Sequence, residues 1–158
     1  MTEKTATFTG HRTIQNVDLP RLTERLEKTI ADLISQGVVR FLSGGATGFD
    51  TMAATAVLAA RNQHQAVKLC MVLPCSNQDE RWKTADRLTY RHLLEIADEV
   101  FYVSEKPYFD GCMEQRNRYL IQNSSVCVAY MRRGRSGTSQ TVRFAREHGL
   151  TVINLAEE

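Results

Sequence analysis

Short apolar runs alternate with longer stretches of helical spacing along the whole chain, and this alternation limits the folds that it can adopt. It is typical of a mainly parallel sheet of about six strands that is covered by helices on both faces. The apolar runs, rich in Val, Phe and Cys, predict strands over residues 5–9, 38–42, 67–73, 99–104, 126–131 and 151–155.

Five helices are expected between these strands. In the first, Leu22, Leu26 and Ile30 recur at helical intervals, with Pro20 in the first turn and Gly37 at the end. The others are predicted around residues 51–63, 80–97, 113–123 and 137–149. The chain has 158 residues, of which 42% are apolar and 24% charged, and it contains no linker or repeat. A single domain over residues 1–158 is therefore expected.

Composition and charge argue against nucleic acid, a metal or a membrane as a partner of this protein. The formal net charge is only +2, and the densest basic cluster, Arg132-Arg133-Gly134-Arg135, is short. Nucleic acid is therefore not an expected partner. No Cys and His spacing suits a metal, so no metal is expected, and no cofactor is predicted. The start of the chain lacks the pattern of a signal peptide, and no run approaches the ~18 apolar residues of a membrane span. We expect a cytoplasmic protein without a membrane partner.

Glycines and polar residues follow the first two predicted strands, at the sheet edge where open α/β proteins bind ligands. Gly10 allows a sharp turn after the first strand, and Arg12 offers a planar fork suited to phosphate or carboxylate. The second strand runs into the sequence SGGATGFD, residues 43–50. This segment is either a phosphate site or a plain tight turn.

The phosphate interpretation assigns a role to each polar or glycine position of that segment. Gly44 and Gly45 would let a ligand approach the backbone, and Gly48 opens a helix whose amides favour anions. Ser43 and Thr47 can donate hydroxyl hydrogen bonds. Asp50 in the first helical turn could cap amides, accept a ribose hydroxyl or take part in catalysis.

The fourth predicted helix carries polar residues within its apolar stripe. Arg116 and Asn117 fall on that stripe by their three- and four-residue spacing from apolar neighbours. Either they face a ligand at the sheet edge, or Arg116 pairs with a buried carboxylate such as Asp98 or Asp110.

Two loops complete the predicted site. Ser136, Gly137 and Thr138 lie at the start of the fifth predicted helix and form a second possible anion site. Tyr108 follows the fourth strand on the expected ligand side, where a nucleobase would need a flat partner. Trp82 has two interpretations, as a stacking partner on the third helix or as a core residue.

These segments, in this order and spacing, resemble the SLOG superfamily of SMF/DprA and LOG proteins, and within it the small stand-alone YpsA-like proteins. The resemblance covers almost the whole chain, with motifs at Thr9-Gly10-His11-Arg12, Ser43-Gly44-Gly45-Ala46, Gly48-Phe49-Asp50, Cys112-Met113 with Arg116-Asn117, and Gly137-Thr138. It implies a Rossmann-like three-layer α/β/α sandwich. It further implies a sensor or regulatory module that binds a nucleotide or nucleotide-derived ligand, ADP-ribose-like or a nucleoside monophosphate.

The resemblance also implies two alternatives. The LOG branch hydrolyses the N-glycosidic bond of nucleoside 5'-monophosphates and uses a glutamate, but Thr141 stands at that position here. A hydroxyl cannot supply the carboxylate charge, so Asp50 or Glu114 would have to replace it as the catalyst. DprA-like proteins bind single-stranded DNA. By analogy with such α/β domains, the chain could form a homo-oligomer.

Overall fold

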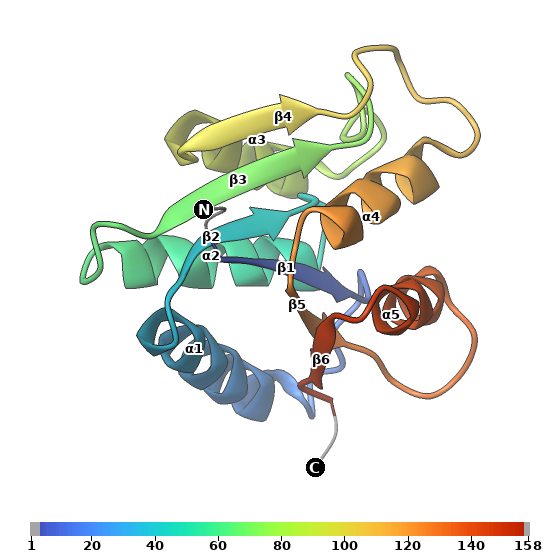
Figure 1. The fold of residues 1–158 in the computed structure, drawn as a ribbon. Coiled ribbons are helices and arrows are strands. Elements are labelled where there is room, and N and C mark those ends of the chain that lie inside the picture. Colours follow the sequence, from blue (N-terminus) through green and yellow to red (C-terminus); the bar gives the residue numbers. More distant parts are fainter. Residues whose placement is uncertain (1–3, 157–158) are drawn as a thin grey trace.

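The computed structural model describes residues 4–156, in which six strands alternate with five helices (Figure 1). The strands are β1 (Lys4–Gly10), β2 (Val38–Ser43), β3 (Lys68–Leu73), β4 (Glu99–Tyr102), β5 (Val126–Tyr130) and β6 (Thr151–Asn154). The helices are α1 (Leu19–Ser35), α2 (Phe49–Arg61), α3 (Thr84–Ile96), α4 (Cys112–Gln122) and α5 (Gly137–Glu147). Each predicted element is present, and most boundaries differ by one or two residues.

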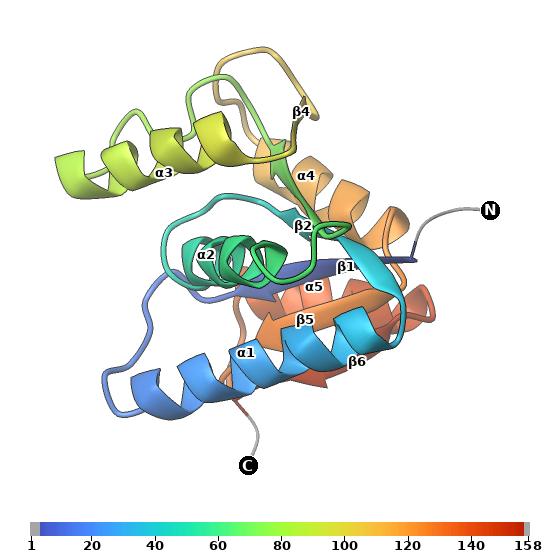
Figure 2. The same cartoon turned by 90° about the vertical axis from the view of Figure 1, so that its left-hand side faces the viewer.

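The strands form one sheet in the order β4-β3-β2-β1-β5-β6, and every pair in it is parallel. Helices α1, α2 and α3 cover one face, and α4 and α5 cover the other (Figures 1 and 2). The predicted three-layer Rossmann-like sandwich is confirmed. The chain winds outward from β1 through β2 and β3 to β4, then returns across the opposite face to β5. The order therefore reverses between β1 and β5, where parallel sheets of this kind leave a crevice.

Apolar side chains from both layers hold this arrangement together. Helix α1 buries Leu22, Leu26 and Ile30 against the sheet, as their spacing predicts. Helix α2 buries Ala53 and Ala54, whose small side chains let the helix approach the strands closely. Within residues 4–156, no helix is both long and apolar enough to span a membrane.

The third helix begins later than predicted, at Thr84 rather than near residue 80. Trp82 consequently lies in the preceding segment, where its ring meets the Tyr90 ring edge-to-face at 5.1 Å between centroids. It also packs against the main core cluster. Of its two sequence interpretations, the structure supports the core residue.

Candidate functional site

A cavity of about 320 Å³ lies at the carboxyl ends of β1 and β5, where the strand order reverses. The end of β1, the segment before α2, and the starts of α4 and α5 surround it. Its lining residues are Phe8, Thr9, Gly10, His11, Arg12, Ala46, Asp50, Met113, Arg116, Asn117, Ser136, Gly137 and Thr138. Of the predicted site residues, the structure brings Gly10, Arg12, Asp50, Arg116, Asn117, Ser136, Gly137 and Thr138 together here.

Arg116 is the buried cation of the cavity, with only 3% of its surface exposed. Its Nη1 donates to the Gly44 carbonyl oxygen at 2.6 Å, and its Nε donates to Asn117 Oδ1 at 3.0 Å. Among residues 4–156, no carboxylate oxygen lies within 4.0 Å of the guanidinium. The suggested pairing with Asp98 is wrong, because Asp98 binds Arg61 at 2.9 Å instead. Burial lowers the pKa of Arg116, and the charge of Asp50 opposes this shift.

Asp50 shares the cavity with Arg116 and is 7% exposed. The amide of Ala46 donates to Asp50 Oδ2 at 3.4 Å, so the carboxylate braces the turn that leads into α2. Burial raises the pKa of Asp50 to about 6, while Arg116, the Ala46 amide and Arg12 pull that pKa down. In the part of the chain that the structure describes, the cavity therefore combines one carboxylate with two guanidinium groups.

We expect Asp50 to make the fold less stable as the pH rises from about 4 to about 6. The folded-state pKa of about 6 exceeds the ordinary value of 3.8. In this window the folded protein binds more protons than the unfolded chain, so the free energy of unfolding falls as the pH rises and then levels off. A shift of this size corresponds to roughly 3 kcal/mol.

The variant Asp50→Asn isolates this effect, because all other titrating groups are common to both proteins. As the pH rises through this window, urea unfolding should show the free energy of unfolding of Asp50→Asn increasing relative to that of the unaltered protein. The lowered pKa of Asp98 acts in the opposite direction, but it cancels in the comparison. A difference that does not change with pH would contradict the buried environment described for Asp50.

Gly44 and Gly45 make room for protein side chains, and neither lines the cavity. A Cβ on Gly44 would lie 2.6 Å from Arg116 Nη1, and one on Gly45 would lie 2.9 Å from Tyr90 Cε1. Both glycines are buried, as is Ser43, whose hydroxyl donates to the Asp50 carbonyl oxygen at 3.1 Å. The predicted contact of these residues with phosphate stays a prediction; the structure packs Gly44 against Arg116 and Gly45 against Tyr90.

Gly48 locks the turn before α2 against the end of β1. Its φ is +80°, and a Cβ there would lie 2.1 Å from the Arg12 carbonyl oxygen. The Phe49 amide donates to the His11 carbonyl oxygen at 3.1 Å, and a Cβ on Gly10 would strike the Phe49 ring at 2.5 Å. The two loops interlock at van der Waals contact, and this contact sets the position of Arg12 relative to Asp50.

The loop before α5 is organised by a capping box. The Ser136 hydroxyl accepts from the Ser139 amide at 3.1 Å, and the Ser139 hydroxyl accepts from the Ser136 amide at 2.8 Å. Helix α5 begins at Gly137, as predicted. Its first residues, Gly137 and Thr138, line the cavity, so this loop presents a helix start to a ligand.

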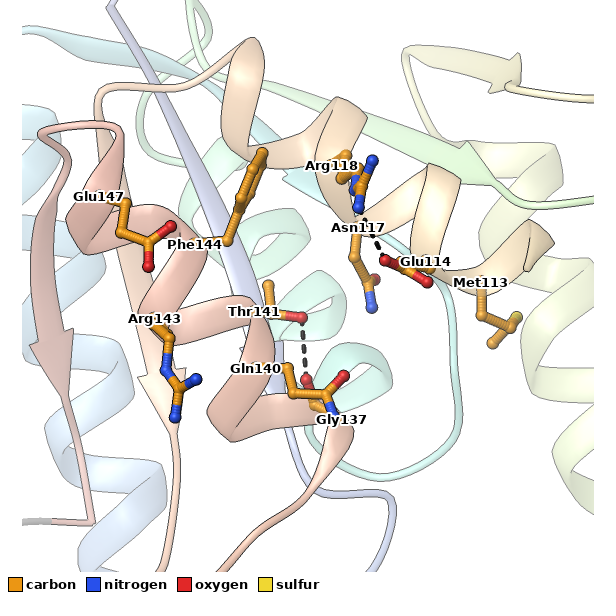
Figure 3. A pocket seen from close by; sticks show the side chains of 10 residues that line it. All are labelled: Met113, Glu114, Asn117, Arg118, Gly137, Gln140, Thr141, Arg143, Phe144 and Glu147. Carbon is orange, nitrogen blue, oxygen red and sulfur yellow. Dashed lines mark hydrogen bonds and ion pairs between the residues drawn. The ribbon is translucent and has the colours of Figure 1, made fainter.

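Three further predicted residues, besides Ser43, Gly44, Gly45 and Gly48, lie outside the cavity lining. Thr47 is partly exposed in the turn before α2, and Tyr108 is 57% exposed in the loop after β4. Glu114 forms an exposed ion pair with Arg118 at 2.9 Å and faces a neighbouring groove (Figure 3). Glu114 was one of the two candidates to replace the missing catalytic glutamate, but it lies outside the cavity that holds Asp50.

Sequence reasoning missed five lining residues, namely Phe8, Thr9, His11, Ala46 and Met113. His11 Nε2 accepts from the Arg132 amide at 2.9 Å, which ties the loop after β1 to the loop after β5. Burial, followed by the charge of Arg132, lowers the pKa of His11. The position of His11 directly after Gly10, at the end of the central strand, was the signal that could have identified it.

The sheet order and the cavity at its reversal define a Rossmann-like α/β protein with a ligand-sized site at the switch point. The profile of the YspA SLOG family matches residues 10–148. The chain belongs to this family.

Sequence relatives are bacterial proteins. The chain is 29% identical over 146 residues to an uncharacterized SPbeta prophage-derived protein, YoqJ, of Bacillus subtilis, covering 85% of each chain. It is 33% identical over 105 residues to a UPF0398 protein of Halalkalibacterium halodurans, covering 65% of this chain and 55% of that protein. It thus spans most of YoqJ but little more than half of the UPF0398 relative.

Solved structures share the fold at lower identity. DNA processing protein A from Helicobacter pylori, described for its single-stranded DNA binding mode, superposes with a TM-score of 0.68 at 22% identity. The match covers 96% of this chain and 64% of that one. DprA from Streptococcus pneumoniae gives a TM-score of 0.65 at 20% identity, over 95% and 49% of the two chains. These matches show a common fold.

Proposed function

We propose that the cavity binds the phosphate group of a nucleotide or nucleotide-derived ligand, and that the protein acts as a sensor or regulatory module. The observation that carries this proposal is the buried guanidinium of Arg116, which lines the cavity without a carboxylate within 4.0 Å among residues 4–156. A buried cation of this kind needs an anionic partner, and a ligand phosphate would provide one.

The surroundings of Arg116 suit an anion. Residues from the first turns of α2, α4 and α5 line the cavity, and the N-terminal end of a helix carries partial positive charge. Arg12 adds an exposed guanidinium at the rim. Asp50 would be repelled by a phosphate in direct contact, so it fits better as an acceptor for a ribose hydroxyl beside the phosphate.

Binding without turnover is the better-supported form of this proposal. Thr141 stands where LOG-type hydrolases use a glutamate, and its hydroxyl donates to the Gly137 carbonyl oxygen at 3.0 Å. Glu114 is exposed and paired with Arg118, outside the cavity. Among residues 4–156, Asp50 is the one carboxylate in the cavity lining, and it is held in the turn by the Ala46 amide.

A second candidate function is binding of single-stranded DNA. The fold match to DNA processing protein A, described for that activity, favours it. Arg132, Arg133 and Arg135 are exposed in the loop between β5 and α5 and would supply backbone contacts. A net charge of +2 and the absence of interleaved aromatic residues weigh against it.

Isothermal titration calorimetry with AMP, ADP-ribose, cyclic ADP-ribose and NAD tests the proposal, after a thermal-shift screen of the same compounds. Adenosine, which lacks the phosphate, is the matched control and should bind far more weakly than AMP. If no phosphorylated compound binds, the proposal is wrong. Retention of a labelled single-stranded oligonucleotide that weakens steeply with salt would favour the DNA-binding candidate instead.

A further inference from the structure

A second cavity opens beside the first, between helices α4 and α5 (Figure 3). Its volume is about 530 Å³, and it shares Met113, Asn117 and Gly137 with the cavity at β1 and β5. We call this second cavity the α4–α5 groove. Because the two cavities share lining residues, a ligand anchored at Arg116 can extend from one into the other. Both volumes fall in the ~300–1,000 Å³ range of small-molecule sites.

The α4–α5 groove has a flat wall. Phe144 is half-buried on α5, and the Arg118 guanidinium lies over its ring, 5.9 Å from the ring centroid. The Glu114 carboxylate lies one helical turn earlier on α4, and its Oε1 accepts a hydrogen bond from Arg118 Nη2 at 2.9 Å. The His148 ring also packs against Phe144, at 4.0 Å between centroids, so the exposed guanidinium of Arg118 is the planar surface on which another planar group can stack.

The α4–α5 groove also offers hydrogen-bonding groups of both kinds. Because Arg116 Nε–H can only donate, Asn117 turns its amide oxygen toward Arg116, which leaves the Asn117 NH₂ group toward the cavities. Gln140 is exposed and lines the groove, and Arg143 from the same helix lines it too (Figure 3). The Gln140 amide can both donate and accept, which matches the mixed edge of a nucleobase.

We propose that the α4–α5 groove holds the nucleobase of a nucleotide whose phosphate lies beside Arg116. This inference rests on the proposed phosphate site and adds the place where the base of the ligand binds. Stacking on the Arg118 guanidinium, which the Phe144 ring supports from behind, supplies the affinity, and Gln140 contacts the edge of the base. A sugar phosphate without a base would fill the first cavity and leave the groove empty.

Calorimetry with AMP and with ribose 5-phosphate, which differ only by the base, separates the two cavities. We expect AMP to bind about 5- to 150-fold more tightly, because stacking of one base is worth ~1–3 kcal/mol. Ribose 5-phosphate is the internal control for the phosphate site. If AMP and ribose 5-phosphate bind equally, the nucleobase inference is wrong while the proposed phosphate site stands. If neither binds, both are wrong.

Two variants locate the base. Gln140→Ala, at an exposed position, should weaken AMP about fivefold and leave ribose 5-phosphate unchanged. Gln115→Ala is the matched control, since Gln115 is exposed on α4 and lines neither cavity. Phe144→Leu keeps an apolar side chain but loses the flat ring, and should weaken AMP by a similar factor. Equal losses for AMP and ribose 5-phosphate in both groove variants would contradict the assignment of the base to the groove.

Discussion

Replacing Arg116 with methionine should abolish most nucleotide affinity while leaving the protein folded. The variant removes the buried cation of the cavity but retains a long side chain that fills a similar space. Charge-assisted hydrogen bonds to phosphate contribute ~1.5–3 kcal/mol, so a loss of about 10- to 150-fold in affinity for AMP is expected by calorimetry. The fold should survive because the Gly44 carbonyl oxygen keeps a second donor, Gln78 Nε2, at 3.1 Å.

Arg146→Met is the matched control, because Arg146 is exposed on α5 and lies outside the cavity lining. It removes the same charge from the protein and should change the affinity very little. Arg116→Met should also raise the pKa of Asp50, since the charge of Arg116 lowers that pKa in the unaltered protein. Undiminished AMP affinity in Arg116→Met would place the phosphate elsewhere on the molecule.

Gly48→Ala should destabilise the protein by about 3–5 kcal/mol, the largest stability loss that we expect for a single added methyl group. The residue has φ +80°, and the new Cβ would lie 2.1 Å from the Arg12 carbonyl oxygen. A rotamer change can relieve neither the strain of the positive φ nor the clash, because both involve backbone atoms. In thermal unfolding this corresponds to a fall in Tm of about 10 °C.

Two other glycines separate the contributions to this loss. Gly149 has φ +77° with open space around a Cβ, so Gly149→Ala should cost only the conformational strain, about 1–2 kcal/mol. Gly137 has neither a positive φ nor a neighbour within 4 Å, so Gly137→Ala should be close to neutral. If Gly48→Ala were no more harmful than Gly149→Ala, the close contact between the two loops would be disproved.

The order and type of the strands and helices could be predicted because hydrophobic periodicity is a local property. Leu22, Leu26 and Ile30 lie three or four positions apart, and the structure buries all three on one face of α1. The start of α3 was predicted too early, because the segment before it also carries polar and aromatic residues. Trp82 fits a helical pattern in sequence, but it lies before the first residue of α3. From there its ring contacts the ring of Tyr90 on that helix.

Much of the candidate cavity could also be anticipated. Parallel strands bring their carboxyl ends to one edge, so residues after β1, β2 and β5 were expected to meet there. Arg12, Asp50 and Thr138 do so. The α4–α5 groove was not anticipated, because nothing local in the sequence records how far apart two helices on the same face of a sheet will lie.

The sequence by itself determined the class of fold, the positions of the loops and the residue types that those loops bring to the sheet edge. Only the tertiary structure decided what each glycine is for. In the sequence, Gly44 and Gly45 suggested a backbone that a phosphate could approach. In the structure, the guanidinium of Arg116 on α4, 72 residues further along the chain, occupies the space beside Gly44. The reason is physical: the absence of a Cβ is a local fact, whereas the atoms that fill the space depend on long-range packing.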